Sequence, residues 1–102
     1  MPQLQPPATK AKSPARRATS FEPLVAAVFG EVIRAERVRQ SIAQDQFALL
    51  ANIDRSYYGK LERGERQPSL ALMLRIAGGL GVPASEILGR VEKQLVGSSA
   101  GR

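Results

Sequence analysis

Apolar residues recur every three or four positions in five separate segments, the spacing that places them on one face of an α-helix. No segment alternates apolar and polar residues over the length of a strand, so we expect no sheet. The pattern predicts one all-α domain over residues 19–96, followed by a flexible tail at residues 97–102. The predicted helices cover residues 19–39, 44–51, 55–63, 70–79 and 83–94.

The first predicted helix begins near Thr19 or Ser20, because Thr19 and Glu22 have the spacing of a capping box. Pro23 is tolerated in a first helical turn. The apolar residues near this end exceed what a small core needs and are a candidate for exposed apolar surface; they are Leu24, Val25, Val28 and Phe29.

Residues 43–64 are the centre of the pattern, since they predict two short helices joined by a tight turn. Asn52 suits the turn because it tolerates positive φ better than most residues. Asp54 occupies the N-cap position of the second helix, and Gly64 the position just after its end. The residues predicted to face inward are Phe47, Ala48, Ala51, Ile53, Tyr58 and Leu61.

Two such helices, the second with a polar and basic outer face, are typical of a helix-turn-helix, which places its second helix in the DNA major groove. Over residues 29–90 the chain resembles the lambda-repressor-like (Xre-type) helix-turn-helix proteins. The resemblance implies a five-helix DNA-binding domain with its helix-turn-helix at residues 44–63. The matching residues are Gln44, Ala48, Asn52-Ile53, Leu61-Glu62-Arg63-Gly64, Arg66-Gln67-Pro68-Ser69, Leu72, Ile76-Ala77, Leu80-Gly81-Val82 and Ile87-Leu88.

The chain departs from the family pattern at two positions in the connector that precedes residue 44. The family usually carries Gly at the position of Ser41, and Ser or Thr at the position of Ala43. Losing the cap hydroxyl at Ala43 costs about 1 kcal/mol, which weakens the start of the second helix without removing the motif.

Candidate base-reading residues lie on the outer face of the predicted helix 55–63. Arg55 can donate two hydrogen bonds to guanine, Ser56 and Lys60 can reach a base edge or a phosphate, and Tyr57 can touch thymine or a phosphate. Gly59 permits close approach to DNA. Other interpretations stay open: Arg55 could pair within its own helix with Asp54 or with charges beside Glu62, Tyr57 could pack at the surface, and Gly59 could simply be tolerated.

Candidate phosphate-binding residues surround this helix: Gln44, Arg39, Arg63, Arg66 and Gln67. The family resemblance implies that Gln44 bonds a phosphate and also buttresses the second helix. It further implies a structural role for Glu62, paired with an arginine of the first helix such as Arg37. For the arginines at the end of the first helix, the alternative is a solvated end that compensates the helix dipole.

The net charge of +6 is unevenly distributed. Residues 1–18 form a predicted disordered basic arm, because they are rich in Pro, Ala and Gln with few large apolar residues. The four basic residues of the arm are Lys10, Lys12, Arg16 and Arg17, without any acid, whereas residues 21–102 carry 11 basic and nine acidic residues. The arm could add phosphate contacts, or it could be a solvated leader.

The chain contains no cysteine and no histidine, which removes the commonest metal ligands and general bases. We therefore expect no enzyme activity, no metal and no cofactor, and no small-molecule ligand is evident. The sequence has no apolar run long enough to cross a bilayer, and it has no signal peptide. We therefore expect no membrane partner. The expected location is the cytoplasm of a bacterium, on nucleoid DNA, for a bacterial or phage-encoded protein.

The predicted function is that of a sequence-specific transcriptional regulator that binds double-stranded DNA as a homodimer on a palindromic operator. The candidate dimer interface on the last helix is Ile87, Leu88, Val91 and Leu95, although for Ile87 and Leu88 a place in the core is the favoured alternative. The start of the first helix is the second candidate. A protein-interaction module that keeps the fold without specific DNA binding is the alternative.

Within the family, the run Asp54-Arg55-Ser56-Tyr57 resembles controller proteins of restriction–modification systems. The same run also occurs in many plain Xre-type regulators. An antitoxin or phage-repressor role stays equally open, because such roles depend on the neighbouring genes.

Overall fold

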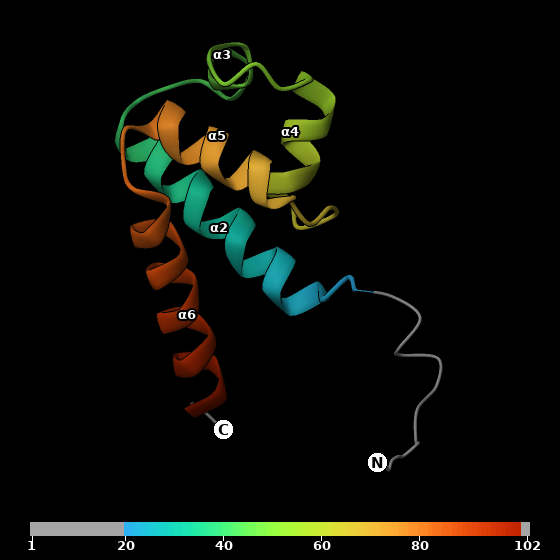
Figure 1. Cartoon of the computed structure of the whole chain (residues 1–102), viewed down its shortest axis with the longest axis vertical. Helices are drawn as coiled ribbons and strands as arrows, with labels where there is room; N and C mark the ends of the chain where they lie inside the picture. Colours follow the sequence, from blue (N-terminus) through green and yellow to red (C-terminus); the bar gives the residue numbers. More distant parts are fainter. Residues whose placement is uncertain (1–19, 101–102) are drawn as a thin grey trace, which may run out of the picture.

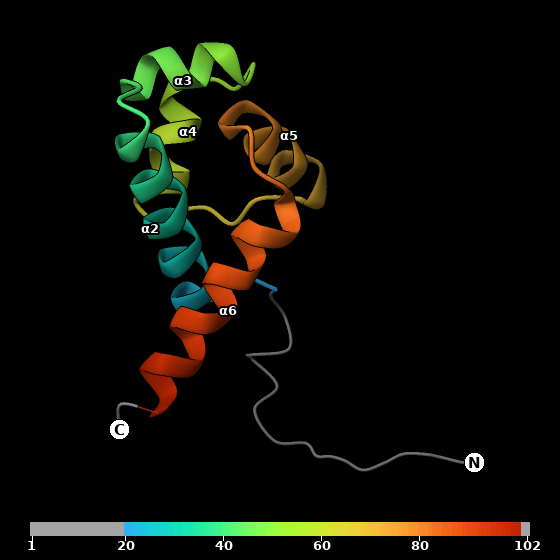
Figure 2. The same ribbon diagram turned by 90° about the vertical axis from the view of Figure 1, so that its left-hand side faces the viewer.

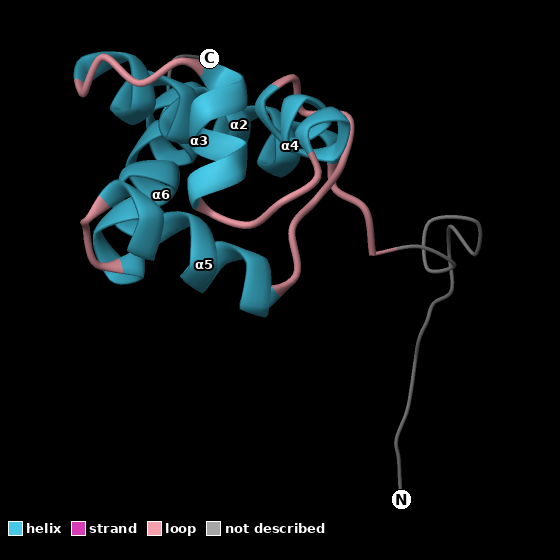
Figure 3. Ribbon diagram, turned by 90° about the horizontal axis from the view of Figure 1, so that it is seen from above, coloured by secondary structure: helices cyan, strands magenta, loops and turns pink. Residues whose placement is uncertain are grey.

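A computed structural model describes residues 20–100 of the chain, with side chains up to residue 97. The predicted arm, residues 1–18, lies outside this range. Within residues 20–100 the fold is all-α, as predicted, and short loops join the helices (Figures 1 and 3). The helices are α2 (Pro23–Arg39), α3 (Gln44–Leu50), α4 (Arg55–Glu62), α5 (Leu70–Leu80) and α6 (Ala84–Ala100).

The core lies where α2 packs against α4, α5 and α6. The helix-turn-helix, α3 and α4, occupies one end of the molecule, and α6 passes alongside α2 and extends away from α3 (Figures 1 and 2). All five described helices contribute apolar side chains to a single cluster. Its buried members are Val28, Phe29, Val32, Ile33, Phe47, Ala48, Ala51, Ile53, Tyr58, Leu61, Ile76, Ala77, Leu80, Ile87 and Val91.

The positions of two helix ends correct the predictions. α2 begins at Pro23 and has Glu22 as its extended N-cap, so Glu22 does not occupy the third helical position that the predicted capping box required. Thr19, the other residue of that box, lies outside the described residues. Proline suits the first helical position because it has no N–H to satisfy. At the other end of the chain, α6 continues to Ala100, beyond the expected end near residue 94 and into the expected tail.

Two non-glycine residues in the turns adopt positive φ, Ser41 at 60° and Asn52 at 58°. The value at Asn52 confirms the predicted turn of the helix-turn-helix. The value at Ser41 explains why glycine is usual at this position, since a Cβ is strained in the left-handed region. Ala43 caps α3 without a hydroxyl, and the side chain of Gln46 instead accepts a hydrogen bond from the Ala43 N–H at 3.3 Å.

Two of the four predicted dimer-interface residues belong to the core of one protomer. Ile87 and Val91 are 3% and 4% exposed because α6 turns them toward α2 and α5. The core alternative therefore holds for Ile87, and the interface prediction for Val91 is wrong. Leu88 is exposed, and Leu95 is half-buried against the core. At the start of α2, Leu24 and Val25 are exposed as expected, whereas Val28 and Phe29 are buried in the core.

A buried acid that sequence analysis did not single out joins α2 to α6. The carboxylate of Glu36 accepts hydrogen bonds from Arg39, from Gln40 and from Arg90 of α6. These donors, led by Arg39, lower the pKa of the Glu36 carboxyl to about 2, so it stays ionised in the core. The amide of Gln40 also donates to the carbonyl of Leu80 at 2.7 Å, which fixes the end of α5.

Gly30 marks the closest approach of α2 to α4. A Cβ built at this residue would lie 2.4 Å from the carbonyl oxygen of Glu62 and 2.5 Å from that of Leu61. Both obstacles are backbone atoms, which cannot rotate out of the way. The absence of a side chain at Gly30 therefore sets the distance between the two helices.

We expect Gly30→Ala to lower the free energy of unfolding by about 1–3 kcal/mol, because the added methyl group forces α2 away from α4. Urea unfolding followed by circular dichroism measures this loss. The matched control is Gly89→Ala on α6, where an added Cβ meets nothing within 4 Å and a gain of about 0.5–1 kcal/mol is expected from helix propensity. Equal unfolding free energies for the two variants would contradict the close approach.

Candidate nucleic-acid interface

A buried ion pair holds the end of α4 against α2. Arg37 donates from Nε to Glu62 Oε2 at 2.6 Å and from Nη2 to Glu62 Oε1 at 2.9 Å. Its remaining nitrogen, Nη1, donates to the carbonyl of Ile42 at 2.7 Å, in the connector that leads to α3. Both charged side chains are less than one-tenth exposed. This confirms the predicted pairing of Glu62 with Arg37.

Two further donors complete the environment of the Glu62 carboxylate. Gln44 of α3 donates from Nε2 to Oε1 at 2.9 Å, which confirms its predicted buttressing role. Tyr58 of α4 donates its hydroxyl to Oε2 at 2.6 Å. The ring of Tyr58 is fully buried and packs against Phe47 with the ring centroids 5.2 Å apart. Glu62 therefore ties α2, α3 and α4 together.

Glu62 remains ionised at neutral pH. Burial alone raises the pKa of a carboxyl group, but the hydrogen bonds from Arg37, from Tyr58 and from Gln44 outweigh burial and lower the pKa of Glu62. Burial and the adjacent carboxylate raise the pKa of the Tyr58 hydroxyl, which keeps it a donor. The network therefore keeps one protonation pattern at neutral pH.

The N-terminus of α4 presents the predicted base-reading residues. Asp54 caps the helix, as predicted, by accepting a hydrogen bond from the Tyr57 N–H at 3.0 Å. Arg55 and Ser56 are exposed, whereas Tyr57 and Lys60 are half-buried. Tyr57 packs against the edge of the core cluster, so its ring has a structural role in addition to any contact made by its hydroxyl.

The acidic neighbour of Arg55 lies on α3 and not within its own helix, where the alternative interpretation placed it. The guanidinium of Arg55 lies 3.9 Å from the carboxylate of Asp45 on α3, and both side chains are more than 60% exposed. Such an exposed pair is weak and leaves Arg55 available to another acceptor. The signal was present in the sequence, since Asp45 follows Gln44 in the first turn of α3, the turn that faces α4.

Gly59 lines the hollow on the outer side of α4 but is buried, so it is not exposed there as expected. A Cβ at this position would lie 3.1 Å from Nη1 of Arg63 and 3.5 Å from Oε1 of Gln44, because these two side chains cover it. The absence of a side chain at Gly59 therefore leaves room for the side chains of Arg63 and Gln44. The polar hollow at this place is lined by Gln44, Asp45, Arg55, Ser56, Gly59 and Arg63.

The candidate phosphate-binding residues occupy different surroundings. Arg63 is exposed and pairs with Glu65 at 2.8 Å, and Arg66 is exposed with one hydrogen bond to the Glu65 carbonyl. Gln67 uses its amide to hold the backbone ahead of α2. Arg39 lies in the Glu36 cluster near α6 and donates its hydrogen bonds to that carboxylate, away from α4.

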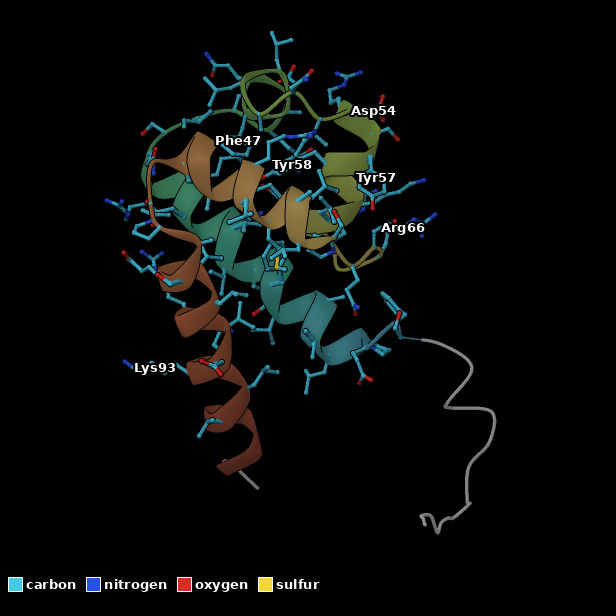
Figure 4. All side chains as sticks on the ribbon, in the orientation of Figure 1. Phe47, Asp54, Tyr57, Tyr58, Arg66 and Lys93 are labelled. Carbon is cyan, nitrogen blue, oxygen red and sulfur yellow. The ribbon has the colours of Figure 1, made fainter. Side chains whose placement is uncertain are left out.

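One side of the molecule gathers the polar end of α4 and the loop that follows it. Figure 4 shows Asp54, Tyr57 and Arg66 along this side, whereas Lys93 of α6 projects from the opposite side. The same side carries the start of the described chain at residue 20 (Figure 4). The candidate interface therefore comprises the N-terminal half of α4, the first turn of α3 and the loop after α4.

No group of three or more acidic, histidine or cysteine side chains that could hold a metal occurs in the described part of the chain. Between residues 20 and 100, no single helix is long and apolar enough to cross a membrane, and α5 and α6 meet that requirement only together, bent by 106°.

The helix-turn-helix geometry has a counterpart in a known family. A family model described as Helix-turn-helix matches residues 33–87, more than half of the sequence. The protein belongs to the Xre-type helix-turn-helix family. This family consists of transcription regulators, not enzymes.

Named relatives include two kinds of regulator. The control protein C.MunI of Mycoplasma sp is 34% identical over 67 residues, which cover 65% of this chain and 90% of that protein. The immunity repressor of Bacillus phage phi105 is 40% identical over 60 residues, 59% of this chain but only 42% of the repressor.

Solved structures of controller proteins resemble this chain. The restriction–modification controller protein C.AhdI from Aeromonas hydrophila has 35% identity and a TM-score of 0.59, covering 61% of this chain and 94% of that one. The controller protein C.Esp1396I, solved as a tetramer with its natural 35 base-pair operator, has 24% identity and a TM-score of 0.67 over 74% of this chain and 99% of that one. This second likeness shows the fold alone.

We expect Arg37→Met to lower the free energy of unfolding by about 3–5 kcal/mol, because it leaves the Glu62 carboxylate buried without its cation. The control is Arg34→Met, an exposed arginine of the same helix, which should stay within about 0.5 kcal/mol of wild type. Denaturant unfolding measures both. Losses of similar size in the two variants would show that the buried pair does not hold α4.

Proposed function

We propose that this protein is a transcriptional regulator that binds double-stranded DNA in a sequence-specific manner, as a homodimer on a palindromic operator. The observation that carries this proposal is the two-sided character of α4. Glu62 fixes its inner side through a buried network, while Arg55 and Ser56 project into solvent at its N-terminus. A recognition helix needs both a fixed orientation and free polar side chains at its leading end.

Arg55 carries the main base contact in this proposal. Its exposed guanidinium can exchange the weak 3.9 Å contact with Asp45 for a bidentate bond to guanine O6 and N7. Asp45 then remains close enough to orient the guanidinium and to repel a misplaced phosphate. Ser56, Tyr57 and Lys60 supply the neighbouring contacts to bases or phosphates.

Phosphate contacts fix the position of α4 on the duplex. Gln44 lines the polar hollow at the start of α3, and Arg63 and Arg66 lie after the end of α4. Together they bracket the reading helix along the DNA backbone. Arg63 is already paired with Glu65, so a phosphate would compete with that carboxylate for it.

A homodimer follows from the size of the site. One helix-turn-helix reads only a few base pairs, and a two-fold pair reads half-sites about 34 Å apart. Of the residues first considered for the interface, Leu88 remains exposed on α6, next to the exposed Val25 of α2. A bacterial or phage-encoded regulator of this kind acts in the cytoplasm on nucleoid DNA.

Selection from a random duplex library at two salt concentrations tests the function. The proposal expects an enriched palindrome with half-sites about one helical turn apart, at both salt concentrations. The family includes controller proteins and an immunity repressor, so the proposal is confined to operator binding. Absence of any enriched sequence, with binding that only weakens in salt, would contradict it and favour an interaction module that keeps this fold.

We expect Arg55→Ala to weaken binding to the selected duplex by about 1–3 kcal/mol and to relax specificity at one base position in each half-site. The control is Lys93→Ala, which removes the same charge from the opposite side of the molecule. Titration by fluorescence anisotropy and a repeated selection measure both effects. An affinity and selected sequence equal to those of the control would exclude Arg55 as a base-reading residue.

A further inference from the structure

The candidate interface carries nearly as many acidic as basic side chains. They lie on the first turn of α3, on the outer side of α4 with its N-cap, and on the loop after α4. Cations that meet phosphates supply most of the affinity for DNA of any sequence, and carboxylates at the same surface oppose it. The basic residues are Arg55, Lys60, Arg63 and Arg66, and the acidic residues are Asp45, Asp54 and Glu65.

Two of these three acids are engaged close to their own position in the chain. Asp54 caps α4 by accepting a hydrogen bond from the Tyr57 N–H. Glu65 pairs with Arg63, two residues earlier in the same loop. Asp45 differs from both, because its carboxylate reaches from α3 to a basic residue on α4.

Asp45 divides its carboxylate between its own helix and Arg55. Its Oδ1 accepts a hydrogen bond from the Gln46 N–H at 3.1 Å, while its Oδ2 lies 3.9 Å from Nη1 of Arg55. The second distance is too long for a hydrogen bond but short enough for attraction between opposite charges. Both side chains line the polar hollow that the proposed function places against DNA.

This attraction has different consequences for guanine and for phosphate. A guanidinium that forms a bidentate bond to guanine keeps other N–H donors, and these can stay beside Asp45. Phosphates lie at the rims of the groove, away from the base edges that a reading helix faces. To reach a phosphate, Arg55 must leave Asp45, and the carboxylate then stays unpaired next to a polyanion.

We propose that Asp45 is a specificity-determining residue, which withholds Arg55 from phosphates but leaves it free for guanine. Asp45 thereby lowers the affinity for DNA of any sequence more than it lowers the affinity for the operator. The ligand that it selects against is the phosphodiester backbone of a duplex without guanine opposite Arg55. The inference rests on the proposed function, because that function assigns the base contact to Arg55.

A double-mutant cycle in the full-length chain tests this role. The four proteins are wild type, Asp45→Asn, Arg55→Ala and the combination. Asparagine keeps the shape of the side chain and an oxygen that can accept the Gln46 N–H, so the substitution removes the charge. Asp45→Ala replaces it if circular dichroism shows that the Asn variant is unfolded.

Two probes separate general binding from specific binding. The first is a random-sequence duplex of about 20 base pairs, which reports phosphate contacts. The second is a duplex of the same length that contains the palindrome enriched by selection. Affinity for both is measured at several salt concentrations.

Asp45→Asn is expected to strengthen binding to the random duplex about 3- to 5-fold at low salt, the size of one exposed ion pair. The gain should shrink as salt screens the pair. In the Arg55→Ala background the same substitution should change this affinity less than about 1.5-fold, because the restrained cation is then absent.

On the palindrome, Asp45→Asn should change the affinity less than about 1.5-fold, so the ratio of specific to random binding falls about 3- to 5-fold. Glu92→Gln is the matched control. It removes the same charge from an exposed position beside Lys93 on α6, and it should leave the ratio unchanged.

Equal gains on random DNA in both backgrounds would overturn the inference, since Asp45 would then repel DNA without acting through Arg55. A loss on the palindrome with unchanged random binding would also overturn it, and would make Asp45 a direct reader of a base such as cytosine. Unchanged affinity for both duplexes would overturn it too, and would leave Asp45 only its favourable place in the first turn of α3.

The two possible failures are distinguishable. If selection enriches no palindrome, the proposed function fails and the specificity role of Asp45 fails with it. If a palindrome is enriched but the cycle shows no coupling between Asp45 and Arg55, the inference alone is overturned.

Discussion

The carboxylate of Glu62, buried against the guanidinium of Arg37, is the interaction on which the rest of the structure depends. Two opposite charges removed from water are stable only if nearly every donor and acceptor around them is satisfied. Here the phenol of Tyr58 and the amide of Gln44 supply the missing bonds to Glu62, and Arg37 also binds a connector carbonyl. A partly satisfied version of this network would be less stable than an apolar core, because buried polar groups without partners cost free energy. The complete network therefore favours a single arrangement of α2, α3 and α4.

This constraint separates the two sides of α4. The inner side carries Tyr58, Leu61 and Glu62, which are buried and fully committed to the fold. The outer side carries Arg55 and Ser56, which are exposed, and the contact of Arg55 with Asp45 is weak. Recognition of DNA needs this division, because free side chains specify a sequence only when the helix that carries them is held in place.

Close backbone contact strengthens the same arrangement. Gly30 lets α2 approach the last turn of α4, and Gly64, with φ of 76°, ends that helix against the backbone of Ala27. The loop that begins at Gly64 then carries Arg66 and Gln67 along the side of the molecule that holds α4. Packing in the core therefore also sets the position of Arg66, which is proposed to bind the DNA backbone.

Local rules predicted the features that depend on a few neighbouring residues. The helical segments, the positive φ of Asn52 and the Asp54 cap all follow from spacing and residue type, and the structure confirms them. The pairing of Glu62 with Arg37 was reached through the family resemblance, because the two residues lie 25 positions apart and no local rule joins them.

Features that depend on packing escaped prediction. Helical spacing places Gly59 on the outer face of α4, but long side chains from two other positions cover it. An apolar stripe on α6 does not by itself show whether its residues belong to the core or to an interface. The packing of α6 against α2 places Ile87 and Val91 in the core.

We propose that DNA binds the side of the molecule that carries α4 and the loop after it. Backbone amide chemical shifts, mapped during titration with an operator duplex, test this proposal. The largest changes are expected in residues 44–45, 55–60 and 63–67, with little change around Lys93 on α6. Changes concentrated on the exposed face of α6, with residues 55–60 unaffected, would contradict it.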